Sequence, residues 1–479
     1  MGSTGKTSSI FSKSLFGLLR NAPPSEETVE FNARVHTASE RKQDTESITL
    51  LIRDGADFVA VCVNSKEVAS SVWEVAQTCT IESILRVSGT LTPSGNNLQL
   101  NHAIQGIDDI SSKVIVASGL IPVSLAVDGL VDRSFQDLKL NEGLNNQILD
   151  MRSASKGAVF RLMSGLWELT VEHCLSEGLM WLSTPNIIGY KTPGDNDYFP
   201  VSYFDHKHAY LAQTCEYHHQ MAFSMDFLPG IFEIRTMFRQ EHRVSKRHLT
   251  EFTSLETAFT IKQDWVEIVD KVDTYIVFVI SQLQKRERFQ HLTSLAKKIY
   301  PSAGNFKLGL DAQGKLPRLK FSEAKKLLND NDQLEDFNPT QEATLGRMMR
   351  SNPPSSYPQT DVFIITEYPK SLRPFNVHPS TSTSETTNSF DVIIRGQETS
   401  SGWQFQHDYQ SLLAAMRAND PPVDPDDPTM KSWLTAYEAG VHPYGGYGIG
   451  LNRLLQGFLG MDDVHDTAIF PRDAQQLIP

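Results

Sequence analysis

The spacing of hydrophobic residues changes along this chain from a period of two to a helical period. Between about residues 29 and 128, apolar and polar residues alternate in short runs, which predicts β-strands. Turn sequences separate these runs at residues 54–55 and 94–97. The apolar members of the runs are Val29, Phe31, Ala33, Val35, Ile48, Leu50, Ile52, Phe58, Ala60, Cys62, Leu98 and Leu100. Several short strands of this kind predict a small barrel.

Helical spacing dominates two later segments. In residues 158–177 the apolar residues fit one face of a helix, which Gly178 is expected to end. These residues are Phe160, Met163, Leu166, Leu169, Val171, Cys174 and Leu175. Residues 265–299 show the same period. Residues 302–360 are instead rich in Asn, Asp, Pro and Ser and contain one short helical stretch at 322–328, which predicts an insertion made mainly of loops.

A basic loop joins two predicted strands in residues 231–260. The loop carries His242, Arg243, Lys246, Arg247 and His248. Arg239 and Glu241 precede it and Phe252 follows it, so a cation, a carboxylate and an aromatic ring are expected on one surface. Such a surface suits a nucleotide, because a guanidinium binds phosphate and a ring stacks on the base. An exposed hairpin with solvated basic residues is the alternative.

Composition favours a globular protein of more than one domain. The chain has 479 residues, which is too long for one small core. Hydrophobic residues make up 40% and charged residues 21%, and no apolar run approaches the roughly 18 residues of a membrane helix. The net charge of -13 argues against indiscriminate binding of nucleic acid, which depends on neutralising phosphates with Lys and Arg.

The four cysteines include no CxxC pair. Cys215, with His218 and His219 close behind, has a spacing that a metal can use, but no second ligand pair accompanies it, so no structural zinc site is expected. Residues 1–25 contain basic residues and serines without an acid, which fits a disordered tail or a weak organellar transit peptide. The expected location is therefore the cytoplasm, with mitochondrial targeting as the alternative.

Three motifs resemble those of the class II aminoacyl-tRNA synthetases, subclass IIb. FRQE at residues 238–241 and RHLTEF at 247–252 are similar to motif 2 of the aspartyl and asparaginyl enzymes. GYGIGLNRL at 446–454 is similar to motif 3, and a weaker motif 1 ends at residues 184–185. Similarity to eukaryotic-type aspartyl-tRNA synthetases covers nearly the whole chain and includes segments at residues 32–37, 144–152 and 470–473.

The resemblance implies an α+β fold. Its parts are an N-terminal OB-fold β-barrel and a class II synthetase catalytic domain built on an antiparallel sheet flanked by helices. The implied boundaries are a flexible segment at residues 1–28, the barrel at 29–128, a hinge at 129–155, and the catalytic domain at 156–479 with an insertion at about 302–360. The resemblance also implies a homodimer joined through the predicted helix at 158–177 and the strand after it.

The residues that bind ATP in the family are matched here. By resemblance, Arg239 bridges the α-phosphate and the substrate carboxylate, and Phe252 stacks on adenine. Arg453 covers the other side of the ring and the γ-phosphate. Arg247 and His248 match positions that hold the terminal phosphates. The resemblance therefore implies an intact ATP site.

Three carboxylates complete this expected site. Glu241, at the end of the FRQE motif, is assigned to catalysis together with Arg239 and Arg453. Asp391 and Glu398 flank a predicted turn in a segment that matches the family's metal-binding pattern, and Glu398 is also assigned to ATP. Hard oxygen ligands shared with phosphate suit Mg²⁺.

The amino-acid pocket departs from the family pattern. Aspartyl-tRNA synthetases hold the side-chain carboxylate of the substrate with an Arg and a Lys, and the matching positions here carry Phe405 and His219. Glu216 replaces a glutamine, Trp403 replaces a small residue, and the glutamate of a mobile lid is missing from residues 192–195. The other residues assigned to the pocket are Glu256, expected to hold the α-amino group, Ser401 and Gln404.

These departures favour a ligase that forms an adenylate from ATP and an amino acid or related acid other than aspartate, because an aromatic ring cannot replace a guanidinium as the partner of a carboxylate.

In the barrel, positions matched to base-reading residues carry Thr49 and Ala60, which argues against tRNA binding and leaves the acceptor open between tRNA and a small molecule. The alternatives are an ordinary aspartyl- or asparaginyl-tRNA ligase and, with less support, a non-catalytic binding protein.

Overall fold

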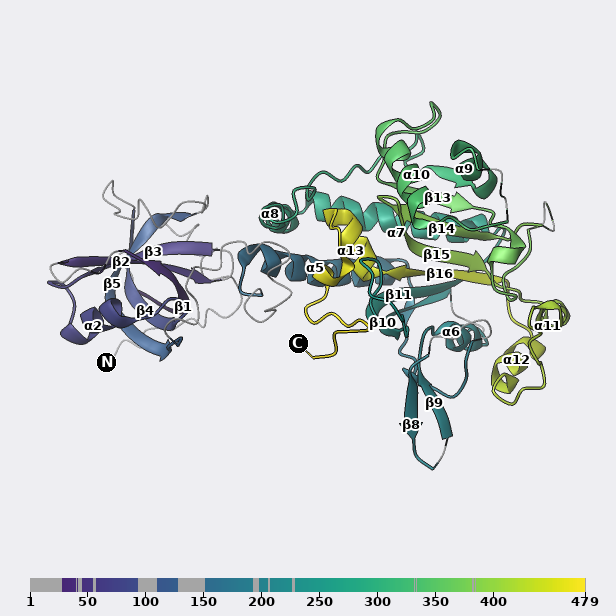
Figure 1. Cartoon of the computed structure of the whole chain (residues 1–479), viewed down its shortest axis with the longest axis horizontal. Helices are drawn as coiled ribbons and strands as arrows, with labels where there is room; N and C mark the ends of the chain where they lie inside the picture. The colour runs from purple at the N-terminus through teal and green to yellow at the C-terminus, as the bar shows by residue number, and fades with distance from the viewer. Residues whose placement is uncertain are drawn as a thin grey trace, which may run out of the picture. The chain divides into compact units, whose positions relative to one another are not determined.

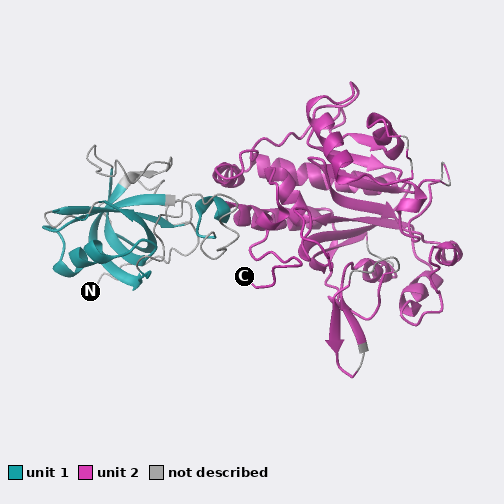
Figure 2. Cartoon of the chain, in the orientation of Figure 1, with its two compact units in different colours: residues 1–157 teal, residues 158–479 magenta. Residues whose placement is uncertain are grey.

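The computed structural model divides the chain into two compact units, residues 1–157 and 158–479 (Figure 2). The structure describes residues 28–479 except 40, 42–44, 55–56, 94–109, 128–150, 193–197, 206, 226–228, 331, 333, 381–382, 384 and 479. The expected N-terminal segment, most of the expected hinge and most of the expected lid therefore lie outside the described residues. None of the described helices combines the length and the apolar character that crossing a bilayer requires.

Unit 1 contains a closed five-stranded barrel with strand order β1-β2-β3-β5-β4 (Figure 1). Its elements are β1 (Thr28–Ala38), β2 (Ser47–Asp54), β3 (Asp57–Asn64), α2 (Ser70–Thr78), β4 (Ile84–Pro93) and β5 (Ile110–Ser124). The alternate residues that point inward form one core, which includes Val35, Leu50, Ile52, Val59, Val61, Leu85, Val87 and Ile115. The predicted period of two thus reflects a sheet closed on itself, in which alternate residues point into the barrel. Strand β2 is buried on both faces.

The predicted strands match β1, β2 and β3. Leu98 and Leu100 lie outside the described residues. The prediction does not include β4, in which Leu85, Val87 and Leu91 alternate with polar residues and Gly89 takes one apolar position. Thr49 and Ala60, the two positions matched to base-reading residues, are both buried.

Unit 2 is built on an eight-stranded sheet with order β12-β13-β14-β15-β16-β11-β10-β6. The strands are β6 (Met180–Trp181), β10 (Gly230–Phe238), β11 (Glu251–Thr260), β12 (Arg318–Lys320), β13 (Val362–Thr366), β14 (Ser389–Ile394), β15 (Gln397–Gln404) and β16 (Tyr444–Gly450). Neighbouring strands are antiparallel except at the two edges, where β6 and β12 pair in parallel. The expected antiparallel sheet is confirmed.

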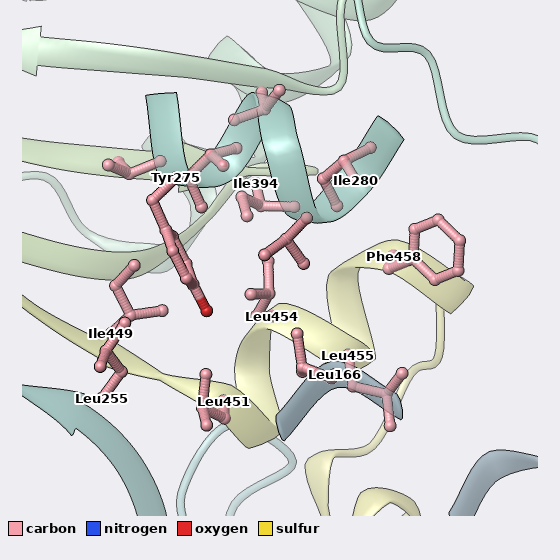
Figure 3. Packing of buried hydrophobic residues seen from close by; sticks show 14 of the residues in the cluster. Leu166, Leu255, Tyr275, Ile280, Ile394, Ile449, Leu451, Leu454, Leu455 and Phe458 are labelled. Atoms are coloured by element: carbon pink, nitrogen blue, oxygen red, sulfur yellow. The ribbon is translucent and has the colours of Figure 1, made fainter. Parts of the chain in front are cut away.

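Helices bury one side of this sheet. They are α5 (Ala154–Ser176), α7 (Val266–Lys285), α8 (Glu287–Ala296) and α13 (Leu451–Leu459). In Figure 3, Leu454 of α13 lies among Tyr275 and Ile280 of α7 and Ile394 of β14, and all four side chains are buried. Burial of apolar surface on this scale is the main stabilising contribution to the fold. The opposite side of the sheet is left for the polar residues described below.

Smaller elements surround the other side of the sheet. A three-stranded sheet contains β7 (Ile187–Ile188), β9 (Lys207–Leu211) and β8 (Pro200–Tyr203). The remaining elements are α6 (Glu216–Ala222), α9 (Phe321–Leu327), α10 (Pro339–Ser351), η1 (Lys370–Leu372), α11 (Tyr409–Ala418), α12 (Lys431–Glu438) and η2 (Val464–Thr467).

The structure differs from two predictions made from the sequence. The predicted helix at residues 265–299 is two helices, α7 and α8, because Arg286 between them adopts an extended conformation with φ -72° and ψ 124°. The expected loop-rich insertion contains α10 and contributes β12 to the sheet. Helix α10 begins with a capping box at Asn338 and a proline in its first turn, signals that fix a helix start even in a polar sequence.

Candidate active site

One cavity of about 560 Å³ in unit 2 brings most of the predicted site residues together. The predicted residues that line it are Glu216, His219, Arg239, Glu241, Arg247, His248, Phe252, Glu256, Glu398, Ser401, Trp403, Phe405 and Arg453. They come from α6, the β10–β11 hairpin, β15, the segment after it and α13. Two predicted residues, Asp391 and Gln404, are buried and do not line the cavity.

The register of the sheet explains how residues so far apart in sequence meet. Ser401 pairs with Gly448, Gly448 with Glu256, and Glu256 with Glu233. These four residues form a row across β15, β16, β11 and β10. Neighbouring residues on a strand point to opposite faces, and Leu255, next to Glu256, belongs to the helix-covered core. The row therefore faces the other side of the sheet.

The row separates two ends of the cavity. Strands β11 and β15 run in the same direction, since each is antiparallel to β16. Phe252 and Glu398 lie four and three residues before the row, and Phe405 lies four residues after it. At about 3.3 Å per residue, Phe252 and Phe405 are roughly 13 Å from the row in opposite directions. We call these the cationic end (Arg239, Arg247, His248, Phe252, Glu398, Arg453) and the aromatic end (Glu216, Tyr217, Asn376, Trp403, Phe405).

Glu256 lies between the two ends. Its carboxylate accepts a hydrogen bond from Ser254 Oγ at 2.6 Å. The space it occupies exists because residue 448 is glycine: a Cβ there would lie 2.8 Å from both carboxylate oxygens. Burial raises the pKa of Glu256 to about 7, while its hydrogen bond to Ser254 and the nearby guanidinium groups oppose this shift. An anionic carboxylate at the middle of the cavity suits an ammonium group.

Arg453 holds the cationic end together through backbone carbonyls. Its Nε donates to the carbonyl oxygen of Arg247 at 3.1 Å, and its Nη1 donates to that of Glu398 at 3.0 Å. The hairpin loop and β15 are thereby fixed to α13. Across the cavity, the guanidinium carbon of Arg239 lies 5.8 Å from the centre of the Phe252 ring. A flat ring beside a cation is a surface on which a purine base can stack.

The loop cation Arg247 has a partner from the insertion. Its Nη2 lies 2.5 Å from Oε2 of Glu342 on α10. Oε2 of Glu342 also lies 3.4 Å from the backbone nitrogen of Glu398. Burial raises the pKa of Glu342, Arg247 opposes the shift, and the negative charge of Glu398 adds to it. The insertion thus supplies a carboxylate to the cationic end.

Asp391 and Glu398 occupy different depths. Glu398 faces the cavity, whereas Asp391 lies behind it and accepts a hydrogen bond from Nη2 of Arg373 at 2.8 Å. Burial raises the pKa of Asp391 to about 7; Arg373 opposes this shift, and the charge of Glu398 adds to it. Two carboxylates that repel each other are a donor set that a hard cation neutralises, so these residues fit Mg²⁺.

The aromatic end is formed by side chains without a positive charge. The ring of Phe405 stacks on Tyr444 with centres 5.0 Å apart. Asn376 donates to Oε1 of Glu216 at 2.5 Å. Among the described residues, the indole N–H of Trp403 and the hydroxyl of Tyr217 are buried polar groups without a hydrogen-bond partner. Such groups are expected to bind a ligand.

Gln404 takes a structural position. Its side-chain oxygen accepts from Asn388 at 2.7 Å, and its backbone nitrogen donates to the carbonyl oxygen of Asn388 at 2.9 Å. Its backbone oxygen accepts from the backbone nitrogen of His378. Gln404 therefore fixes the segment that carries Asn376 to the end of β15.

Sequence reasoning missed Glu342, Arg373 and Asn376. Glu342 lies in residues 302–360, where polar composition predicts loops, and Arg373 and Asn376 follow that segment, where no period marks them as functional. The only local signal is the capping box that begins α10. It predicts a helix but does not indicate that Glu342 contacts Arg247.

Comparison with known proteins agrees with this geometry. The family described as tRNA synthetases class II (D, K and N) matches residues 139–474. The chain is similar to the cytoplasmic aspartate–tRNA ligase of Rattus norvegicus, with 30% identity over 95% of this chain and 89% of the relative. It is also similar to the aspartate–tRNA(Asp) ligase of Pyrococcus horikoshii, with 28% identity over 96% of this chain and 100% of the relative.

Solved structures give the same result. The aspartyl-tRNA synthetase of Entamoeba histolytica is similar with a TM-score of 0.79 and 25% identity, over 97% of this chain and 92% of that one. The asparaginyl-tRNA synthetase of Pyrococcus horikoshii in complex with asparaginyl-adenylate has a TM-score of 0.78 over 95% and 97%, and at 21% identity it supports the fold alone. The chain therefore belongs to the class II tRNA synthetases of the D, K and N group, and it is an ATP-dependent, AMP-forming ligase that uses Mg²⁺.

Proposed function

We propose that the cavity joins an amino acid to AMP and releases pyrophosphate, and that the amino acid is one other than aspartate. The observation that carries this proposal is the arrangement of Glu256 between a cationic end and an aromatic end. ATP fits the cationic end, the α-amino group fits Glu256, and the side chain of the amino acid reaches the aromatic end.

In this proposal the cationic end positions ATP and stabilises charge. Phe252 and Arg453 enclose adenine, and Arg239 binds both the α-phosphate and the reacting carboxylate. Arg247 and His248 hold the leaving pyrophosphate, and Glu241 orients the hairpin cations. The attacking nucleophile is the carboxylate of the amino acid, so positioning and electrostatic stabilisation supply the catalysis.

Glu398 and Asp391 hold Mg²⁺ in this proposal. The ion supplies charge neutralisation between phosphate oxygens when it is bound. Glu398 offers its carboxylate directly to the cavity. Asp391 lies behind Glu398 and is paired with Arg373. With the ion bound, the Asp391 carboxylate would interact with both Arg373 and the ion.

The aromatic end supports a substrate side chain that is not a carboxylate. The five residues that define this end include Glu216 and neither Arg nor Lys, and Arg373, which lines the cavity near Asn376, is already paired with Asp391. A second carboxylate near Glu216 would be repelled and desolvated without a partner. A polar side chain with a hydrogen-bond acceptor for Trp403 and a donor for Glu216 suits this end better. Ser401, which Gly448 separates from Glu256 in the row, contacts the backbone of the substrate.

Pyrophosphate exchange tests this proposal directly. The purified chain, ATP, labelled pyrophosphate and each amino acid in turn are expected to give exchange with at least one amino acid other than aspartate. Arg239→Gln is expected to abolish that exchange, while the control Arg288→Lys, on the exposed face of α8, retains it. Binding of ATP without exchange for any amino acid contradicts the proposal.

Aspartate itself is the second candidate substrate, because the relatives above are named aspartate–tRNA ligases. Exchange with aspartate alone supports this candidate. For either amino acid we propose tRNA as the acceptor, since the same relatives act on tRNA by name. Acid-gel detection of aminoacyl-tRNA tests that step, and adenylate formation without any charged tRNA contradicts it.

We also propose a homodimer through α5 and β6. Trp167 and Leu175 are 42% and 54% exposed and lie eight residues apart, on one face of α5. Trp181 on β6 is 52% exposed. Exposed aromatic and apolar residues grouped in this way are typical of interfaces. Light scattering after gel filtration is expected to give twice the chain mass, and Trp167→Glu is expected to give the monomer mass.

A further inference from the structure

Cys215, His219 and Glu233 bring three metal-binding atoms together beside the cavity. Sγ of Cys215 lies 3.4 Å from Nε2 of His219, and the same nitrogen lies 3.3 Å from Oε2 of Glu233. The three ligand atoms all lie within 4.8 Å of one another, and all three residues are buried. The sequence predicts no zinc site here, because no second ligand pair accompanies Cys215 and Glu233 lies on a separate predicted strand.

The backbone explains the arrangement. Cys215 is the residue before α6, and His219 is four residues later, so one helical turn places both side chains on the same face. Glu233 comes from β10, at the end of the row that contains Glu256. Thr184 fixes its carboxylate through two hydrogen bonds of 2.8 Å, one from the backbone nitrogen and one from Oγ1. Such support from outside the ligand set orients a metal ligand.

We propose that these three residues bind a zinc ion. In a tetrahedral site with a Zn–S bond of about 2.3 Å and Zn–N and Zn–O bonds of about 2.0–2.1 Å, neighbouring ligand atoms are roughly 3.3–3.6 Å apart. The two separations that involve Nε2 of His219, 3.4 and 3.3 Å, have these values, and the third pair, Cys215 and Glu233, lies within 4.8 Å. A soft thiolate with an imidazole selects zinc over the magnesium expected at Asp391 and Glu398.

The proposed site lies at the edge of the cavity, which His219 lines and Cys215 and Glu233 do not. His219 lines the cavity, as do Thr214 and Glu216 on either side of Cys215. Three protein ligands with one position left for water or substrate are typical of zinc sites that act on a ligand. The ion therefore provides an electrophilic group at the edge of the proposed amino-acid site.

The charges around the site are compatible with a divalent ion. Arg235 lies 3.6 Å from Oε2 of Glu233 and also interacts with the Cys215 thiol. Its guanidinium donates in addition to Pro185 O and Asn186 Oδ1, on the side of the motif 1 segment. Zinc binding displaces the thiol proton of Cys215, which leaves to solvent. The thiolate and the Glu233 carboxylate then balance the ion, and Arg235 retains its carbonyl acceptors.

Metal analysis of the full chain tests this inference without any assay of activity. After incubation with excess zinc and exhaustive dialysis, elemental analysis is expected to find about one zinc per chain. Cobalt in place of zinc is expected to give an absorption band from thiolate-to-metal charge transfer. The matched control is Cys174→Ala, since Cys174 is also a buried thiol but lies in α5; it retains the metal, whereas Cys215→Ala loses it.

Two further variants cover the case in which Cys215→Ala fails to fold. His219→Gln and Glu233→Gln preserve side-chain size, and each is expected to weaken zinc affinity at least about tenfold. Absence of zinc and of the cobalt band in the folded wild-type chain overturns the inference and leaves a hydrogen-bonded triad. Metal retained equally by Cys215→Ala and the wild type overturns it as well. Because pyrophosphate exchange is measured separately, neither result bears on the proposed adenylation.

Discussion

Glu256 and Gly448 face each other on neighbouring strands, and the carboxylate of one fills the space that a side chain on the other would need. A Cβ on residue 448 would lie 2.8 Å from both carboxylate oxygens. The two residues are paired in the register of β11 and β16. The anionic centre of the cavity therefore depends on a glycine that belongs to a different motif.

Gly448→Ala is expected to displace Glu256 and weaken binding of the amino acid. We expect KM for the amino acid to rise by about tenfold or more, since an ammonium group loses a charged partner, while KM for ATP changes little. Steady-state pyrophosphate exchange measures both constants. Gly189→Ala serves as the control, because a Cβ there meets no atom within 4 Å. Equal KM values for the amino acid in both variants contradict this role of Gly448.

The pKa of Glu256, raised to about 7, predicts a pH dependence of substrate binding. Below about pH 7 the carboxylate of the free enzyme is protonated and cannot pair with an ammonium group, so KM for the amino acid is expected to increase as the pH falls from 8 to 6. Glu256→Gln is expected to remove this dependence. An unchanged pH profile in Glu256→Gln contradicts the assignment.

The same raised pKa also affects the stability of the fold. A salt-bridged acid stabilises the fold as the pH rises, whereas Glu256 is expected to destabilise it. Between the unfolded value of 4.5 and about 7, the folded state binds the proton more tightly than the unfolded state, so stability falls as pH rises through this window. Glu256→Gln is expected to be more stable than the wild type at pH 8 by on the order of 2 kcal/mol, and about equal to it at pH 4. Urea denaturation at the two pH values measures the difference. Glu251→Gln, at the exposed start of the same strand, is the control.

Removing Arg373 is expected to leave the buried carboxylate of Asp391 without its partner. Arg373→Gln should destabilise the fold by about 3 kcal/mol, because a buried charge loses its counterion. Added Mg²⁺ should restore part of this loss, since the ion replaces the missing positive charge. The double variant with Asp391→Asn should be more stable than Arg373→Gln alone. Additive effects of the two substitutions on the free energy of unfolding contradict the coupling.

The contribution of Arg453 to the exchange rate is expected to depend on the shape of its guanidinium group as well as on its charge. Its Nε and Nη1 donate to carbonyl oxygens on two segments, and a lysine cannot reproduce both hydrogen bonds. Arg453→Lys should lower the rate of exchange by about 100-fold. Arg288→Lys on exposed α8 makes the same chemical change and should leave the rate unaltered. Comparable rates in the two variants contradict a geometric role for Arg453.

Local features of the fold are those that the sequence predicts well. The sequence predicts the hairpin of β10 and β11 because its alternation and its basic loop are contiguous, and it predicts the barrel strands β1 to β3 from the same kind of local alternation. It does not predict the break at Arg286, because neither glycine nor proline marks this position. Helix α10 lies in a polar segment where its capping residues are the only signal.

The candidate site depends more on register than on local pattern. Sequence motifs identify Arg239, Phe252 and Arg453, but the contact of Glu256 with Gly448 follows from the insertion of β16 between β15 and β11. The meeting of His219 with Glu233 follows from the packing of α6 near β10. Neither relationship has a periodic signature, since the partners belong to elements far apart in sequence.

The place of β16 has a consequence for synthesis of the protein. This strand (Tyr444–Gly450) is the last in the chain, yet it lies in the interior of the eight-stranded sheet. Until residue 450 has left the ribosome, β11 and β15 expose unpaired edges, which are prone to association with other strands. A chain terminated before β16 therefore loses the strand that joins β12-β13-β14-β15 to β11-β10-β6, and these two parts of the sheet remain unpaired with each other.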